Sequence, residues 1–351
     1  MNIKPLVIGD LTAEVPVMQG GMGVGISLSG LAGAVAAQGG IGILSTAQIG
    51  YRDPDFDKDP IGCNLKAIKT EVKKAREIAD GGVIGVNIMV ATRRYEEYVK
   101  AAIEAGVDLI VSGAGLPVDL PGLVQNTKTK LVPIVSSVKS VHVIIKYWLK
   151  KYDRLPDAIV IEGPLAGGHL GFTREQLEDI ENLHYDEEVK NIICTVNDTA
   201  KAHQANIPVI MAGGIYTRDD MEHYLALGAS GVQMATRFVT TYECDADERY
   251  KQSYINARKE DIVIVKSPVG MPGRAILNPF MEKAKKDRIP HGMCHLCVST
   301  CKPDETPYCI TDALVNAARG NVEDALLFCG ANAWRAEKIE HVKDIMDGFR
   351  P

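Results

Sequence analysis

The sequence is poor in aromatic residues and has neither long apolar runs nor an excess of basic residues. Only 6% of its 351 residues are Phe, Trp or Tyr. No apolar run approaches the roughly 20 residues that a membrane-spanning helix needs, and residues 1–18 lack the apolar core of a signal peptide. The net charge of −6 argues against a nucleic-acid partner, since phosphate neutralisation needs a dense basic surface. We therefore expect a cytoplasmic protein without a membrane or nucleic-acid partner.

Glycine and cysteine are the residues that stand out instead. The chain has 33 glycines, many of them directly after short apolar runs, and such a placement lets the backbone approach a ligand closely. It also has eight cysteines, although the reducing cytosol does not favour structural disulfides. The glycines therefore point to a ligand site, and the cysteines need another explanation than disulfides.

Short runs rich in Val and Ile alternate with stretches of helical period over the first two-thirds of the chain. The runs are almost continuously apolar, as parallel strands buried on both faces require. We expect strands at 15–19, 41–45, 83–89, 109–113, 131–136, 158–162, 208–212 and 231–235. We expect helices at 28–38, 65–79, 93–105, 118–126, 138–151, 186–205 and 218–227. Eight such units predict an α/β fold, a (β/α)8 TIM barrel; an open doubly wound sheet is the alternative.

The pattern changes at Thr240, which divides the chain into a barrel domain, residues 1–239, and a C-terminal extension, residues 240–351. The extension combines charged helices, a Pro/Gly-rich loop at 267–279, a cysteine cluster and a final helical stretch. We expect it to cover the top of the barrel, with its last helices packed on the barrel. The polar segment 163–184 is also expected to cover a site.

Nearly all residues at the carboxyl ends of the expected strands, where barrel enzymes carry their chemistry, are small or amide-bearing. Glycines let a flat ligand lie against the backbone, amides can bond the edge of a heterocycle, and backbone N–H groups before a helix suit a phosphate. These residues predict a binding site for flavin mononucleotide (FMN), unless the glycines merely form tight turns. They are Gly20, Gly21, Met22, Asn87, Glu162, Gly213, Gly214, Gln233, Met234, Ala235 and Thr236.

One histidine, His169, lies between Gly167, Gly168 and Gly171 after the sixth expected strand. Imidazole is well suited to proton transfer near neutral pH. We predict that His169 is catalytic or polarises the substrate; a structural role is the alternative. The other histidines are expected on helix or loop surfaces.

Five ordered motifs carry a family resemblance: PVMQGGMG, VNIMV, EGPLAGGHLGF, IPVIMAGGI and GVQMATRF, followed by SPVGMPGRAILNPF at 267–280. The chain resembles the nitronate monooxygenases, formerly 2-nitropropane dioxygenases, whose superfamily includes the FMN-dependent enoyl-acyl-carrier-protein reductases. The resemblance implies oxidation of an alkyl nitronate to a carbonyl compound and nitrite. A flavin-dependent reductase of an activated alkene or enoyl thioester is the alternative, and a non-enzymatic flavin redox sensor is a third reading.

The resemblance also implies roles for particular residues. His169 takes the place of the family's catalytic histidine, and segment 267–280 that of the segment closing over the substrate. Three positions depart from the family: Glu162 replaces a glutamine, Leu165 a glutamate and Ala235 a glycine. The implied FMN contacts are Asn87, Glu162, Gly167, Gly214 and Gln233 to Thr236, with Gly20, Gly21 and Met22 beside the flavin ring.

Half of the cysteines lie within sixteen residues, with the spacing C-x2-C-x3-C-x7-C: Cys294, Cys297, Cys301 and Cys309. Four thiolates in one short loop can hold zinc or an iron–sulfur cluster. Zinc sites usually pair two C-x2-C hooks, and only one is present here. The spacing resembles that of the 2,4-dienoyl-CoA reductase group, and this resemblance implies a [4Fe–4S] cluster beside FMN, which we prefer over zinc and over free thiols. The remaining cysteines are expected in the core, and the extension could also serve a homodimer.

Overall fold

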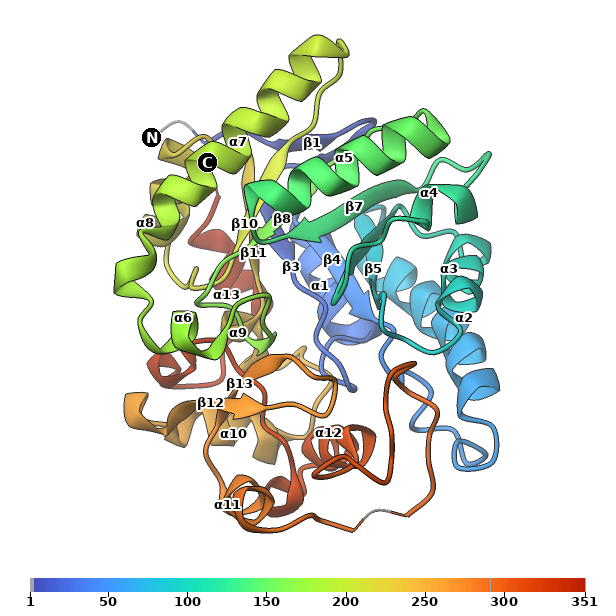
Figure 1. Ribbon diagram of the computed structural model, residues 1–351, viewed down its shortest axis with the longest axis vertical. Helices are drawn as coiled ribbons and strands as arrows, with labels where there is room; N and C mark the ends of the chain where they lie inside the picture. Colours follow the sequence, from blue (N-terminus) through green and yellow to red (C-terminus); the bar gives the residue numbers. More distant parts are fainter. Residues whose placement is uncertain (1–2, 291, 351) are drawn as a thin grey trace.

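Eight parallel strands close into a barrel in the computed structural model, which describes residues 3–290 and 292–350. Figure 1 shows the barrel with its helices outside. The predicted TIM barrel is confirmed, and each barrel strand lies in a predicted strand segment or within one residue of it. The strands, in their order around the barrel, are β3 (Val17–Gln19), β4 (Ile41–Ser45), β5 (Val83–Met89), β6 (Leu109–Gly113), β7 (Lys130–Val135), β8 (Ile159–Glu162), β10 (Val209–Ala212) and β11 (Gly231–Met234).

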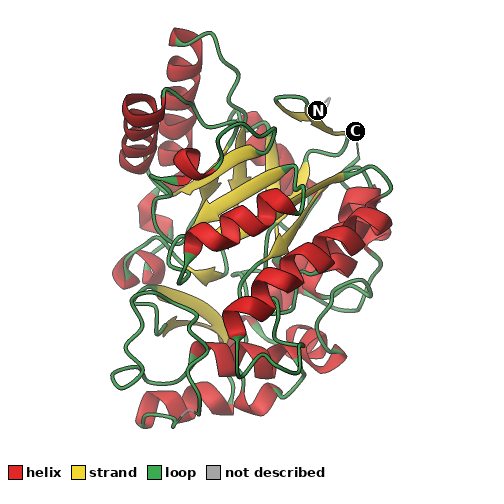
Figure 2. Cartoon of the chain, turned by 90° about the vertical axis from the view of Figure 1, so that its right-hand side faces the viewer, coloured by secondary structure: helices red, strands yellow, loops and turns green. Residues whose placement is uncertain are grey.

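Helices that follow the strands cover the outside of the barrel, as Figure 2 shows from a second side. They are α1 (Ser29–Ala37), α2 (Pro60–Ala79), α3 (Tyr95–Glu104), α4 (Leu120–Leu123), α5 (Val138–Tyr152), α7 (Tyr185–Ala202) and α8 (Arg218–Ala226). The fourth is much shorter than the predicted 118–126, because Pro121 and Gly122 weaken a helix there. In the described part of the chain, no helix is both long and apolar enough to cross a bilayer.

A short antiparallel hairpin closes the end of the barrel away from the extension, and the sequence patterns did not predict it. It consists of β1 (Leu6–Ile8) and β2 (Leu11–Ala13). Its buried residues Leu6 and Ile8 pack with inward-facing residues of the barrel strands, such as Ile41 and Leu109. The hairpin therefore seals the barrel's interior at the amino ends of the strands.

The extension covers the opposite end of the barrel, below it in Figure 1. Its strand β13 pairs on one side with β12 and on the other with β9, which belongs to the segment after the sixth barrel strand. The prediction of a loop at 267–279 was therefore partly wrong, because five of its thirteen residues form β13. The remaining elements come from the segment after β8, the turn after β11 and the extension. They are β9 (Gly168–His169), α6 (Arg174–Glu178), α9 (Thr236–Val239), α10 (Glu248–Asn256), β12 (Ile262–Lys266), β13 (Pro272–Ile276), α11 (Pro279–Lys286) and α12 (Ile310–Ala318), with the 3-10 turns Glu181–Leu183, Lys259–Asp261, Val322–Asp324 and Ala333–Arg335.

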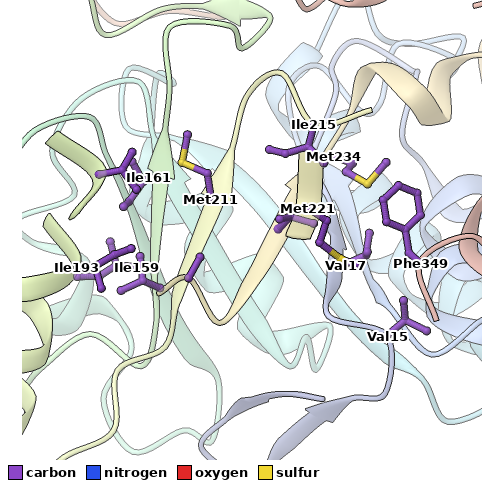
Figure 3. Packing of buried hydrophobic residues seen from close by; sticks show 14 of the residues in the cluster. Val15, Val17, Ile159, Ile161, Ile193, Met211, Ile215, Met221, Met234 and Phe349 are labelled. Atoms are coloured by element: carbon purple, nitrogen blue, oxygen red, sulfur yellow. The ribbon is translucent and has the colours of Figure 1, made fainter. Parts of the chain in front are cut away.

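The last helix, α13 (Val342–Asp347), returns to the side of the barrel and packs against α1. Phe349 joins the same buried cluster as Val15 and Val17, as Figure 3 shows. On the other side, Arg218 of α8 donates a 2.6 Å hydrogen bond to the carbonyl of Arg350. The chain thus places α13 where the eighth outer helix of a barrel belongs, and residues 240–341 form an insertion between the last strand and the last helix.

Candidate active site

A single cavity opens between the carboxyl ends of the barrel strands and the extension. All thirteen residues that the sequence indicated as flavin contacts or as the catalytic histidine line it. They come from five strand ends and from the loop that contains β9. They are Gly20, Gly21, Met22, Asn87, Glu162, Gly167, His169, Gly213, Gly214, Gln233, Met234, Ala235 and Thr236.

Three polar side chains face the cavity without a protein partner. Within the described part of the chain, the side chains of Asn87, Glu162 and Gln233 make no hydrogen bond. Burial raises the pKa of the Glu162 carboxyl to about 7. Polar groups in such a position require partners, so this wall of the cavity is suited to a ligand that carries donors and acceptors.

A backbone cradle lies at the ends of the last two barrel strands. Gly213 and Gly214 both adopt positive φ, at +101° and +83°, and their N–H groups have no acceptor among the described residues. Beside them, Thr236 Oγ1 accepts a 3.0 Å hydrogen bond from the N–H of Gly330. Two adjacent free N–H groups in this conformation form a concave site for an anion, as a phosphate group requires.

His169 lies in the cavity wall with a defined orientation. Its Nε2 is 2.7 Å from Ser267 Oγ, and its ring meets that of Phe328 edge-on at a centroid distance of 5.0 Å. Burial lowers the pKa of His169 to about 4, because the surrounding protein solvates an imidazolium poorly. His169 is therefore neutral at pH 7, so it can accept a proton or exchange hydrogen bonds with a substrate.

The loop that carries His169 is fixed by the extension. Strand β9 pairs His169 with Gly273, and the Arg274 guanidinium donates to the carbonyl of Ala166. A Cβ on Gly167 would lie 2.5 Å from the backbone of Cys329, so only glycine permits this approach. The histidine's position thus depends on contacts between segments about 100 residues apart.

Several cavity residues were missed because they belong to the extension. Tyr250 and Tyr254 of α10 line the cavity, and both hydroxyls donate to the carbonyl of Phe328. The side chain of Asn332 donates a 2.6 Å hydrogen bond to the carbonyl of Gly214 in the cradle. The glycine and asparagine in the segment FCGANAWR, residues 328–335, were the available signal, but nothing in the sequence places them beside strands far earlier in the chain.

The four clustered cysteines lie at the edge of this cavity. Cys297 lines it, whereas Cys309 lines a second cavity next to it. All four thiols are free. Burial raises the pKa of the Cys301 thiol, and the charges of Cys297 and Cys294 raise it further. Cys194 was expected in the core and is exposed, whereas the other three scattered cysteines are buried as expected.

His295, between the first two clustered cysteines, is buried, so the expectation of a surface position was wrong. Its ring stacks on Phe56 at 5.1 Å, and its Nε2 is 3.1 Å from Asp57 Oδ1. Its Nδ1 lies 3.4 Å from Asp312 Oδ1. Cys309, Asp312 and His295 each offer a ligand atom, and these atoms lie within 4.8 Å of one another. The trio is a candidate for a mononuclear metal site.

Comparisons with known proteins agree with this geometry. A model of the family described as nitronate monooxygenase matches residues 4–349. A probable nitronate monooxygenase of Staphylococcus saprophyticus is 25% identical over 317 residues, which cover 83% of this chain and 84% of that protein. The structure of FabK from Thermotoga maritima is similar with a TM-score of 0.72 and 26% identity, covering 96% of this chain and 91% of that one. Nitroalkane oxidase from Streptomyces ansochromogenes, at 18% identity, shares the fold with a TM-score of 0.69 over 95% and 94% of the two chains. Because the family model spans almost the whole sequence, the chain belongs to the nitronate monooxygenase family.

Proposed function

We propose that this oxidoreductase binds FMN in the barrel cavity and oxidises small alkyl nitronates to carbonyl compounds and nitrite. Its enzyme class follows from the family. The observation that carries the proposal is that all thirteen residues indicated by the ordered motifs line one cavity, with a neutral histidine in its wall. Nitronates are small anions, which a cavity with a limited set of polar groups can orient.

The residues present fit FMN at both of its ends. Gly213, Gly214 and Thr236 would hold the phosphate, through the free N–H groups of the cradle. The unpartnered side chains of Asn87 and Gln233 would bond the edge of the ring system. When bound, FMN supplies the electron transfer that none of the protein side chains can perform.

The chain's own residues orient the substrate and control proton movement. The neutral His169 would donate a hydrogen bond to the nitronate, and Ser267 Oγ, 2.7 Å from its Nε2, keeps the ring in place. Val269, Ile310 and Phe328 of the extension form an apolar wall over the same cavity. Such a wall excludes water, which strengthens the electrostatic interactions inside the site.

A second candidate is reduction of an activated double bond, in the manner of the enoyl-acyl-carrier-protein reductases that the chain also resembles. The apolar wall favours this candidate, because it would accommodate the hydrocarbon chain of an enoyl thioester better than a small anion requires. In that reaction, the neutral His169 would polarise the substrate carbonyl by donating a hydrogen bond to it.

The experiment that tests the proposal measures flavin content and substrate use together. Purified protein is expected to contain about one FMN per chain and to release nitrite from alkyl nitronates under air. The variant Thr236→Glu should lose FMN, because its carboxylate would face the phosphate dianion, whereas the control Thr236→Ser keeps the hydroxyl and should retain it. Full FMN in Thr236→Glu would refute the phosphate site, and enoyl-thioester reduction without nitrite release would favour the second candidate.

A further inference from the structure

The first part of the loop from Cys294 to Cys309 is fixed beside the barrel. The backbone N–H of Arg93 donates to the carbonyl of Cys297 at 3.1 Å, and the N–H of Ser299 donates to that of Ala91 at 2.9 Å. A bridge between Thr92 and Val298 completes this attachment. Residues 297–299 are therefore hydrogen-bonded to the loop that follows β5, and β5 is one of the strands that line the active-site cavity.

A buried glutamine joins the two ends of the loop to each other. The side chain Nε2 of Gln48 donates to the carbonyl of His295 at 3.1 Å and to Thr311 Oγ1 at 3.2 Å. His295 lies between Cys294 and Cys297, and Thr311 follows Cys309 by two residues. Gln48 is itself held by Asn64, which donates to its Oε1. The loop thus returns upon itself, so that cysteines from its two ends are brought together.

The four thiols are neighbours within the folded loop, and none of them is paired in a disulfide. Cys294, Cys297 and Cys301 lie near enough for their charges to act on one another, as do Cys297 and Cys309. Possible donors lie beside the more buried thiols: the Thr311 side chain beside Cys297, and the first backbone N–H groups of α12 beside Cys309. Hydrogen bonds from such donors stabilise and tune metal-bound thiolates.

We propose that Cys294, Cys297, Cys301 and Cys309 together bind one iron–sulfur cluster of the four-iron type at the edge of the active-site cavity. Each thiolate would ligate a different iron. This inference does not rest on the proposed substrate or on FMN.

The arrangement of the thiols favours a cluster over a single zinc ion. Zinc–sulfur bonds of about 2.3 Å at tetrahedral angles place thiolates about 3.8 Å apart. In the described part of the chain, no three of the four thiols approach within 4.8 Å, since the one group of ligand atoms that does is His295, Cys309 and Asp312. Four thiols that are neighbours at a wider spacing suit a cluster, because each binds its own iron.

The short distances among His295, Cys309 and Asp312 can be explained without a metal ion. Cys309 and Asp312 are close because both lie at the start of α12, and His295 faces carboxylates of Asp57 and Asp312 through its two ring nitrogens. A mononuclear site there would use one of the four cysteines and leave the other three without a role. A mononuclear site also predicts that a different set of substitutions abolishes metal binding, so experiment can distinguish it from the cluster.

The location of the site follows from Cys297, which belongs both to the loop and to the cavity wall. A cluster bound there would lie against the space that we assign to the flavin. The rest of the loop has few apolar residues of its own, and three of its thiols are partly buried. Metal binding would therefore also supply folding free energy to this part of the extension.

The test is metal analysis of the full-length protein, purified without oxygen, with flavin measured separately. We expect about four iron and four acid-labile sulfide per chain, together with broad visible absorbance that dithionite bleaches and an electron paramagnetic resonance signal after one-electron reduction. Absence of both iron and zinc, or one zinc per chain without iron, would overturn the proposal. Flavin content does not enter this outcome, so failure here is distinct from failure of the proposed function.

Single substitutions identify the ligands. Cys294→Ser, at an exposed position where unfolding is not expected, should reduce bound iron at least severalfold, and so should Cys301→Ser. Cys194→Ser is the matched control, since Cys194 is equally exposed but lies on α7, and it should retain all the iron. Asp312→Asn should also retain it. Loss of metal in Asp312→Asn with full retention in Cys294→Ser would instead establish the mononuclear trio.

Discussion

Replacement of His169 tests the centre of the proposed mechanism. His169→Gln keeps hydrogen-bonding groups but removes proton transfer, and His169→Ala removes both. Each should retain FMN, because the phosphate cradle consists of backbone N–H groups and Thr236. Turnover should fall by about 10²–10⁴-fold if His169 moves a proton during the reaction. Nitrite release or enoyl-thioester reduction, normalised to bound flavin, measures this effect.

The same histidine should make the stability of the flavin-free protein depend on pH. Burial lowers the folded-state pKa of His169 to about 4, below the value of about 6.5 in an unfolded chain. At this residue the unfolded state therefore binds more protons between these values, so wild type should lose stability relative to His169→Gln as the pH drops from about 6.5 through about 4. The difference between the two pKa values of His169 corresponds to about 3 kcal/mol of unfolding free energy. At about 2 cal/mol/K of unfolding entropy per residue, this is about 4 °C in the melting temperature.

The control is Ser267→Ala, which removes the hydroxyl that bonds His169 but leaves the imidazole. It should reduce turnover less than His169→Gln does. It should also retain most of the pH dependence of stability that His169 causes. Thermal melts of flavin-free protein between pH 4 and pH 7.5 provide the comparison. If His169→Gln turns over normally with both substrate classes and melts with the wild-type pH dependence, the histidine has only a structural role.

Two further predictions concern buried carboxyl groups. Burial raises the pKa of Glu162 to about 7, so flavin-free wild type should lose stability relative to Glu162→Gln as the pH rises from about 4.5 through 7; the difference between their melting temperatures at pH 5 and pH 8 decides this. Asp245 accepts hydrogen bonds from the backbone N–H groups of Leu28, Gly30 and Leu31 at the start of α1. Asp245→Ala should cost about 3 kcal/mol in unfolding free energy by urea titration, and Asp245→Asn, which keeps one acceptor, should cost less. Equal stability of Asp245→Ala and wild type would show that water replaces these bonds.

Much of the barrel could be predicted because its strands are specified locally. Runs such as residues 83–89 and 109–113 are apolar on both faces, which only a buried parallel strand requires, and the residue at each strand's carboxyl end then lies at one rim of the barrel. Asn87, Glu162 and Gln233 meet in the cavity for that reason. Their convergence follows from topology, so it needs no knowledge of side-chain contacts.

The contacts of the extension were not predictable in the same way. Ser267, Gly330 and Asn332 reach the site through pairing and loop contacts between segments about 90 to 120 residues apart. His295 is buried among residues of distant segments, with Phe56 and Asp57 beside it, and no periodicity in the sequence indicates that packing. Residues in an irregular segment can be read as candidate ligands from their chemistry, but their neighbours depend on the completed fold.

The position of the extension in the chain explains how one cavity acquires two different walls. Since α13 completes the ring of outer helices, both ends of the insertion are anchored to the barrel, and the segment between them cannot move away as an independent domain would. The barrel supplies the glycines and amides suited to a cofactor, and the insertion supplies Val269, Phe328 and Cys297 on the facing side. Changes within the insertion can therefore alter the substrate, or add a metal centre, without disturbing the cradle formed by Gly213 and Gly214. On this argument, the cofactor should be common to relatives that share the barrel motifs, whereas the substrate should follow the sequence of the insertion.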